Sequence, residues 1–140
     1  MDPVARLEEA VKHRNAYEVE DALCEDYDSS RSEEYVAVLI ELLGHEWHIK
    51  HEDIALELQR LRDPEAIGIL RITAERKFGY LDFDDSKALA RKCTWALADI
   101  GTEDARIALK EIAQLPDEEV AGYAQKRLER WEQEKERKRA

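Results

Sequence analysis

The sequence predicts an all-α protein, an α-solenoid of about four helical hairpins (HEAT-like repeats) that stack as a right-handed superhelix. The segment from Leu58 to Ala74 recurs as Leu97 to Ala113, with leucines and alanines at matching positions. A second match, Leu89 to Leu97 against Val120 to Leu128, has a shorter offset. Repeats of about 30 to 47 residues, each made of two helices, are typical of solenoids, because one unit cannot bury its apolar face alone.

Composition supports the same fold class. The chain has 140 residues, of which 39% are charged and 44% hydrophobic, with only 5 Gly and 3 Pro. This profile is typical of a globular helical protein and not of a disordered one. We expect a single HEAT-like domain over residues 1–134 and a charged, frayed tail over residues 135–140.

The expected helices follow from apolar periodicity and from capping residues. Asn15, with Glu18 three residues later, is a cap for the second helix, and Thr102 is a cap for the seventh. Asp63 and Pro64 form the start of the fifth helix, since proline suits a first helical turn. The expected helices cover about residues 4–11, 15–27, 33–43, 52–61 and 64–77, then begin near residues 85, 102 and 116.

The spacing between the matched segments is longer in the first repeat match than in the second. This difference indicates that one unit has extra residues between its two helices. This surplus is predicted to lie in the loop from Gly79 to Asp85. The loop mixes aromatic and acidic side chains, and long loops on a rigid scaffold often carry binding contacts. Tyr80 and Asp82 are therefore candidate partner contacts. The alternative is that Tyr80 and Phe83 only cap the core.

The charge is unevenly distributed along the chain. The net charge is −11, and residues 125–140 hold seven Lys or Arg against four Glu, so residues 1–124 carry −14. Such a field repels phosphate backbones and speeds the encounter with basic partners. Nucleic acid is therefore not an expected ligand, whereas a basic protein is; the alternative is that the acidity serves solubility alone.

No apolar run approaches the roughly 18 residues that a membrane span needs, and the first residues lack a signal-peptide core. We therefore expect a cytoplasmic protein that does not enter a membrane. The two cysteines, Cys24 and Cys93, form no C-x-x-C motif and are expected to be reduced. Cys93 is predicted to lie in the core, because it matches Ala124 of the next repeat.

Several segments resemble HEAT repeats. They run from His51 to Gln59, through Asp63-Pro64, and from Ala88 to Gly101. The resemblance is to the short form found in small bacterial proteins and phycobilin-lyase-like proteins, and it covers about residues 50–131. Small acidic proteins of this type are also similar to immunity proteins, which cover the active site of a secreted bacterial toxin. The resemblance implies a binding platform and no particular partner.

In such a stack the second helix of each hairpin would line the concave side. Trp95 is expected about 160° from the core stripe of its helix, facing water. Leu56, at the equivalent position one repeat earlier, would extend this apolar stripe. Exposed tryptophan is typical of interfaces. The alternative is that Trp95 packs against a loop or a neighbouring helix.

The same side would also carry charge. Glu18, Asp21 and Glu25 are predicted on one face of the second helix, opposite its apolar residues, so that its concave face would be acidic. The expected row continues through Glu52, Arg60 and Arg91 to Lys126. A surface graded from acidic to basic would suit a partner with one strongly basic patch, whereas a solvated face is the alternative for any single carboxylate.

Tests for catalytic and metal sites are negative. His45, His48 and His51 recur at every third position, but the H-E-x-x-H motif needs its second histidine four residues after the first. A polar loop is the favoured interpretation of these histidines. The acidic run near Asp82 lacks the glycine and the bidentate glutamate of a calcium loop. No nucleophile motif is present, so we expect no enzymatic activity, no metal and no cofactor.

The leading hypothesis is a non-enzymatic binding protein that occludes a basic partner, as the immunity protein of a secreted bacterial toxin. The second hypothesis is a scaffold or assembly factor of the phycobilin-lyase-like type, in which Arg60, Arg91 and Lys126 would hold the propionates of a tetrapyrrole. A helical-repeat DNA glycosylase is the third, and the acidic charge argues against it.

Overall fold

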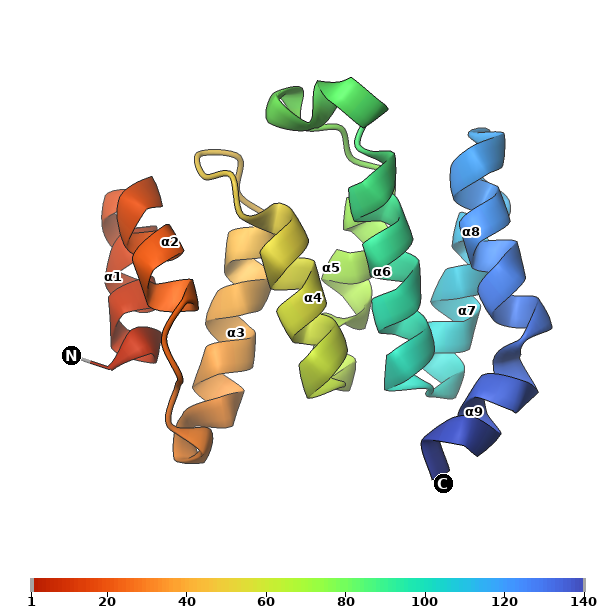
Figure 1. Ribbon diagram of the computed structural model, residues 1–140, viewed down its shortest axis with the longest axis horizontal. Helices are drawn as coiled ribbons and strands as arrows, with labels where there is room; N and C mark the ends of the chain where they lie inside the picture. The colour runs from red at the N-terminus through yellow and green to blue at the C-terminus, as the bar shows by residue number, and fades with distance from the viewer. Residues whose placement is uncertain (1, 140) are drawn as a thin grey trace.

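The computed structural model describes residues 2–139, and over these residues the chain is helical with no strand (Figure 1). The all-α prediction is confirmed. The helices are α1 (Pro3–His13), α2 (Ala16–Leu23), α3 (Ser32–Leu43), α4 (His51–Leu61), α5 (Ile67–Thr73), α6 (Lys87–Ile100), α7 (Glu103–Ile112), α8 (Glu118–Glu129) and α9 (Trp131–Arg139). Short 3₁₀ segments are η1 (Ser29–Arg31), η2 (Pro64–Ala66) and η3 (Gly79–Asp84).

Capping residues place the helix starts where the sequence predicts them. Asn15 Oδ1 accepts the Glu18 N–H at 3.1 Å, and Thr102 Oγ1 accepts the Ala105 N–H at 3.1 Å. Asp63 caps η2 by accepting the Glu65 N–H at 2.9 Å. Each cap satisfies an N–H that has no partner within its helix, so local sequence is sufficient to start these helices. Gly101 ends α6 with a φ of 73°, a left-handed conformation that glycine adopts without strain.

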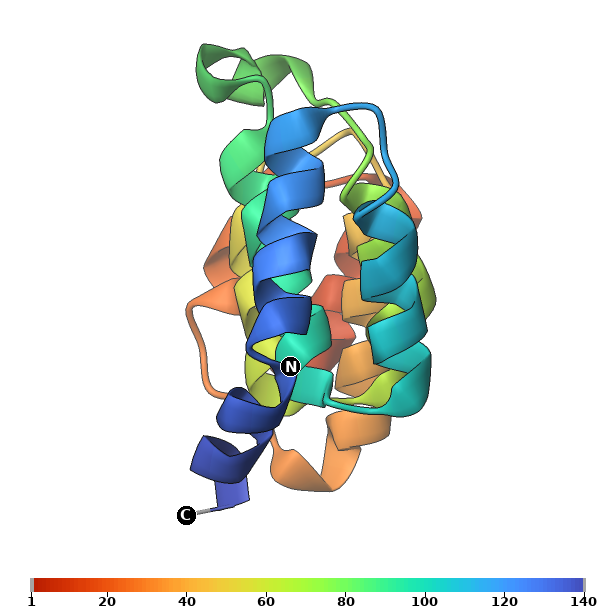
Figure 2. The same cartoon turned by 90° about the vertical axis from the view of Figure 1, so that its right-hand side faces the viewer.

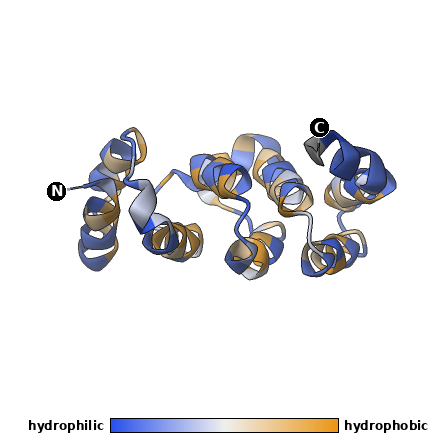
Figure 3. Cartoon of the chain, turned by 90° about the horizontal axis from the view of Figure 1, so that it is seen from below, coloured by the Kyte–Doolittle hydropathy of each residue, from blue (hydrophilic) through white to orange (hydrophobic). Residues whose placement is uncertain are grey.

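The helices from α3 to α8 lie in two layers (Figures 2 and 3). One layer holds α4, α6 and α8, with α6 packed between the other two; the second holds α3, α5 and α7, with α5 in the middle. At the N-terminal end, α1 packs against both α2 and α3. The two chain ends lie at opposite ends of the long axis (Figure 1).

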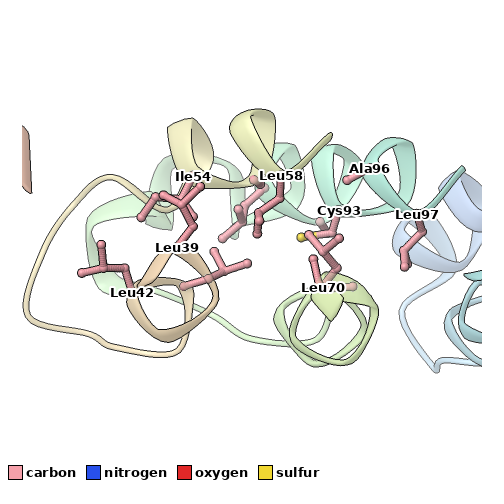
Figure 4. Close-up of a cluster of buried hydrophobic side chains, with 14 of the residues drawn as sticks. Leu39, Leu42, Ile54, Leu58, Leu70, Cys93, Ala96 and Leu97 are labelled. Atoms are coloured by element: carbon pink, nitrogen blue, oxygen red, sulfur yellow. The ribbon is translucent and has the colours of Figure 1, made fainter. Parts of the chain in front are cut away.

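The core lies between the two layers. Leu39 of α3, Ile54 and Leu58 of α4, Leu70 of α5 and Cys93 of α6 are all fully buried and converge there (Figure 4). The prediction that Cys93 belongs to the core is confirmed. The two layers therefore share one continuous apolar core.

Three helix ends differ from the predictions. Helix α2 ends at Leu23, so that Tyr27 lies outside it and stacks on Tyr35 of α3 with ring centroids 4.1 Å apart. Helix α5 ends at Thr73, short of the expected residue 77. The last helix is interrupted at Arg130, after which α9 runs to Arg139; residues 135–139, expected to form a frayed tail, are helical, and Ala140 lies outside the described residues. Trp131 and Glu134, in the first half of α9, are buried.

The surplus residues between the repeats lie where the sequence predicts them, since η3 forms within the Gly79–Asp85 loop. Within residues 2–139, no helix is both long enough and apolar enough to cross a membrane.

Candidate functional site

Glu18 and Asp21 of α2 share one face with Glu25, which follows the end of the helix, but these carboxylates do not stand free. Glu18, Asp21 and Glu25 surround the guanidinium of Arg6 on α1, which donates hydrogen bonds to Glu18 and, at 2.6 Å, to Glu25. Asp21 lies 3.9 Å from the same group. Ion pairing with these carboxylates raises the pKa of Arg6. One arginine of the chain therefore offsets part of the charge expected to face a partner.

Trp95 does not face water as expected. Its ring is half-buried, and the Arg127 guanidinium of α8 lies 3.6 Å from the ring centroid. Arg127 is itself buried and bonds to Glu134 of α9 at 2.7 Å. The second repeat match aligns Arg127 with Ala96, which is buried on the core side of α6, so the sequence held a signal for the burial of Arg127 but none for its contact with Trp95. The alternative interpretation, packing against a neighbouring helix, is the correct one.

Leu56 is exposed as expected, with 53% of its surface accessible. It lies at a hollow of ≈ 340 Å³ that we call the α2–α4 groove, lined by Glu20, Leu23 and Cys24 on one side and by Lys50, Asp53, Leu56 and Glu57 on the other. An adjoining hollow of ≈ 320 Å³ adds Glu25, Asp26, Tyr27, Tyr35 and Arg60. Leu56, Glu25 and Arg60 are thus the predicted residues that the fold brings together around one opening.

Ion pairs organise the rim of the α2–α4 groove. Lys50 lies 3.7 Å from Glu20 and 3.4 Å from Asp53, so that it links α2 to the start of α4. Arg60 donates to Glu57 at 2.7 Å, and the Tyr35 hydroxyl donates to the same carboxylate at 3.0 Å. These bonds lower the pKa of Glu57, whose charged form they favour. Lys50, Asp53 and Glu57 were not among the predicted site residues, although Asp53 and Glu57 share α4 with Leu56. Only the tertiary fold brings the α2 side of the groove opposite them.

Glu52 and Arg91 lie away from this groove. The Lys92 ammonium of α6 donates to Glu52 at 3.1 Å, so Glu52 ties α4 to α6. Arg91 is exposed on α6, and Lys126 is exposed on α8. The predicted row from acidic to basic is therefore interrupted by a charge pair between helices.

Tyr80 and Phe83 of the surplus loop are both exposed, Tyr80 less so at 38%, and only Tyr80 is held by hydrogen bonds. The Tyr80 hydroxyl donates to His51 Nδ1 at 2.7 Å and accepts the His51 backbone N–H at 3.2 Å. Phe83 is 80% exposed, and Asp82 is exposed beside it. The capping interpretation therefore fits Tyr80, which holds the loop to α4, but not Phe83.

The histidines form a buried stack in place of the expected polar loop. His48 and His51 are buried with ring centroids 4.2 Å apart, and Phe78 stacks on His51 at 4.0 Å. His48 Nδ1 accepts the Lys50 N–H, and its Nε2–H donates to the Leu42 carbonyl at 2.7 Å. The ring nitrogens of both residues are thus engaged within the chain. Among the described residues, no group of three or more His, Cys, Asp or Glu is arranged to hold a metal ion.

The two cysteines have opposite environments. Cys24 is exposed at the α2–α4 groove, whereas Cys93 is fully buried, and burial raises the pKa of its thiol to about 12. Neither forms a disulfide.

Comparison with known proteins supplies no family for this chain. No family model, curated protein or solved structure is significantly similar to it.

Proposed function

We propose that this chain is a HEAT-type α-solenoid that acts as a non-enzymatic binding protein for a basic protein partner. The observation that carries the proposal is the α2–α4 groove together with the hollow that adjoins it, where the exposed Leu56 lies near five carboxylates. Glu20, Asp53 and Glu57 line the groove itself, and Glu25 and Asp26 line the adjoining hollow; among the described residues that line the two hollows, Lys50 and Arg60 are basic. An apolar anchor within a charged rim is the usual anatomy of a protein interface.

The solenoid assignment is supported by the repeat offsets and by the two-layer packing of α3 to α8. Helix α4 packs on α6 and α6 on α8, so successive second helices form one face. Such stacked helices serve as extended binding platforms.

The binding mechanism would be occlusion of a cationic surface. Exposed ion pairs such as that between Lys50 and Asp53 contribute little stability, about 0 to 1 kcal/mol, so a partner's lysine or arginine can replace Lys50 at small cost. Leu56 would then lose its remaining exposure to water. A secreted toxin that uses a basic patch for its substrate is the partner we favour, and the protein would be its immunity protein.

A non-enzymatic role is supported by the burial of three side chains of the types that serve as nucleophile or general base. His48, His51 and Cys93 are buried. Burial lowers the pKa of the two histidines and raises that of the cysteine, which favours the neutral form of each side chain. Catalytic groups with shifted pKa values normally line an open cleft, where a substrate can reach them. These three instead stabilise the core and the loop contacts.

The test begins with the immobilised protein in a lysate of its own organism, at low and at moderate salt. A retained basic protein is then purified, and its affinity is measured for the wild type, for Leu56→Glu and for Ile107→Glu. Ile107 is a matched control, because it is 46% exposed on a helix of the other layer.

We expect Leu56→Glu to weaken binding by about 2 kcal/mol or more, as for a central interface residue, and Ile107→Glu to leave it unchanged. The partner's activity should fall on binding. Equal affinity of the wild type and Leu56→Glu would exclude the α2–α4 groove. Retention of a coloured, cofactor-bearing protein would instead favour the scaffold hypothesis, in which the exposed Arg91 and Lys126 hold the cofactor.

A further inference from the structure

A second groove lies on the other layer, where no contact was predicted. It is a hollow of ≈ 640 Å³ between α3 and η2, which we call the α3–η2 groove. Its lining consists of Glu33, Val36, Ala37 and Ile40 from α3, with Asp63 and Glu65 from the start of η2. It is larger than the α2–α4 groove, at ≈ 340 Å³.

The floor of the α3–η2 groove is apolar. Val36 is buried, Ile40 is half-buried, and Ala37 is exposed between them on α3. The floor can therefore accept a hydrocarbon chain, such as the stem of a lysine or arginine or the side chain of a leucine.

The two grooves differ in how their carboxylates are neutralised. In the α2–α4 groove, Glu20 and Asp53 face Lys50, and Glu57 faces Arg60. In the α3–η2 groove, Glu33, Asp63 and Glu65 form no ion pair with any described residue, and no Lys or Arg belongs to the lining. An incoming cation at this groove would displace no cation of the chain.

We infer that the α3–η2 groove docks an amphipathic basic segment of a partner protein, one that presents Lys or Arg beside Leu-like side chains. The apolar positions would lie on Val36, Ala37 and Ile40, and the cationic heads would reach Glu33 and Glu65 at the rim. Charge complementarity of this kind raises the association rate and selects against acidic partners. The inference takes from the proposed function only the basic character of the partner.

The probe for this groove is a fluorescein-labelled helical peptide of about 14 Lys and Leu residues. Its binding is followed by fluorescence anisotropy at low and at moderate salt, with a Glu/Leu peptide of equal length as the comparison. We expect the Lys/Leu peptide to bind with salt-dependent affinity and the Glu/Leu peptide not to bind.

Matched double variants separate the groove from overall charge. Glu33→Gln with Glu65→Gln removes two unpaired carboxylates of the groove, while Glu129→Gln with Glu132→Gln removes two exposed carboxylates near the C-terminal end. We expect the groove pair to weaken binding about tenfold and the control pair less than about twofold. Ala37→Phe, which fills the hollow without a charge change, should also weaken it, with thermal unfolding used to confirm that each variant folds.

Two outcomes would overturn the inference. The first is no binding of the Lys/Leu peptide, or equal weakening by the groove pair and the control pair. The second is loss of peptide binding in Leu56→Glu but not in the groove pair, which would place the basic segment in the α2–α4 groove. That second result would leave the proposed function standing. Conversely, if Leu56→Glu bound the natural partner as tightly as the wild type does, the proposed function would fail but the inference about the α3–η2 groove would not be affected.

Discussion

Helix α4 lies between α6, in its own layer, and α2, at the N-terminal end of the chain, and its junctions with these two helices are built differently. Toward α6, Leu58 and Cys93 are fully buried, and two polar links cross the seam, Lys92 to Glu52 at 3.1 Å and Gln59 to Asp99 at 2.8 Å. Toward α2, Leu56 is exposed and the α2–α4 groove remains open.

The difference follows from helix length and from where each helix buries its apolar face. Helix α6 has 14 residues and seven of them are buried, whereas α2 has 8 residues, with Val19 and Ala22 buried. Helix α2 packs mainly against α1, so it has no second apolar face to offer α4. The helices of this chain thus pack closely where α4 meets the long α6 and leave a charged opening where α4 meets the short α2.

The largest expected contrast is in cysteine reactivity, because each junction contains one cysteine. Cys24 should react with a thiol reagent in the native protein at nearly the rate of a free thiol. Cys93 should be protected at least about 10³-fold, since its modification requires unfolding. Timed labelling followed by mass spectrometry measures both rates; fast labelling of Cys93 would mean that the α4–α6 seam opens readily.

The second largest expected effect is the loss of stability when a core side chain is truncated. Leu58→Ala removes a fully buried side chain at the closed seam and should lower the free energy of unfolding by about 2 to 5 kcal/mol. Leu23→Ala, at the half-buried edge of the groove, should cost less than half as much. Urea denaturation compares the two variants, and equal losses would contradict the difference between the junctions.

Acid should destabilise the protein through the histidine stack at the start of α4. Burial lowers the pKa of His51 to about 4, from an ordinary value of 6.5, and also lowers the pKa of His48. Between pH 6.5 and pH 4 the unfolded chain binds more protons at these histidines than the folded chain does. The free energy of unfolding therefore has its full value above about pH 6.5 and falls as the pH approaches 4. His51 alone would account for about 3 kcal/mol of the loss.

Unfolding by urea at several pH values measures this effect. Replacement of the exposed His13 by Gln is the control and should leave the pH profile unchanged. A stability that does not vary between pH 7 and pH 4.5 would show that the His48–His51 stack is not buried in solution.

The smallest expected effect is that of the ion pair across the closed seam. A double-mutant cycle with Lys92→Met and Glu52→Gln should give a coupling of about 0.2 to 1 kcal/mol, because both side chains are about one-third exposed. A coupling several times larger than this range would mean that polar links, and not apolar packing, close the α4–α6 seam.

The class of fold and most of the helix starts follow from the order of the residues alone. Asn15, Asp63 and Thr102 cap as predicted, and the surplus between the repeats lies in the Gly79–Asp85 loop. These features depend on residues within one or two turns of each other or on a direct match between repeats, so they can be read along the chain.

Which surfaces are available to a partner depends on how the helices pack against one another. Arg6 meets Glu18 across two helices, Arg127 lies over Trp95 from a neighbouring helix, and the unpaired Glu33 and Glu65 come together from separate segments. Helical periodicity places a side chain on a face, but it does not specify which side chain of another helix lies opposite. The charge that a partner meets depends on those pairings, which form only when the helices pack.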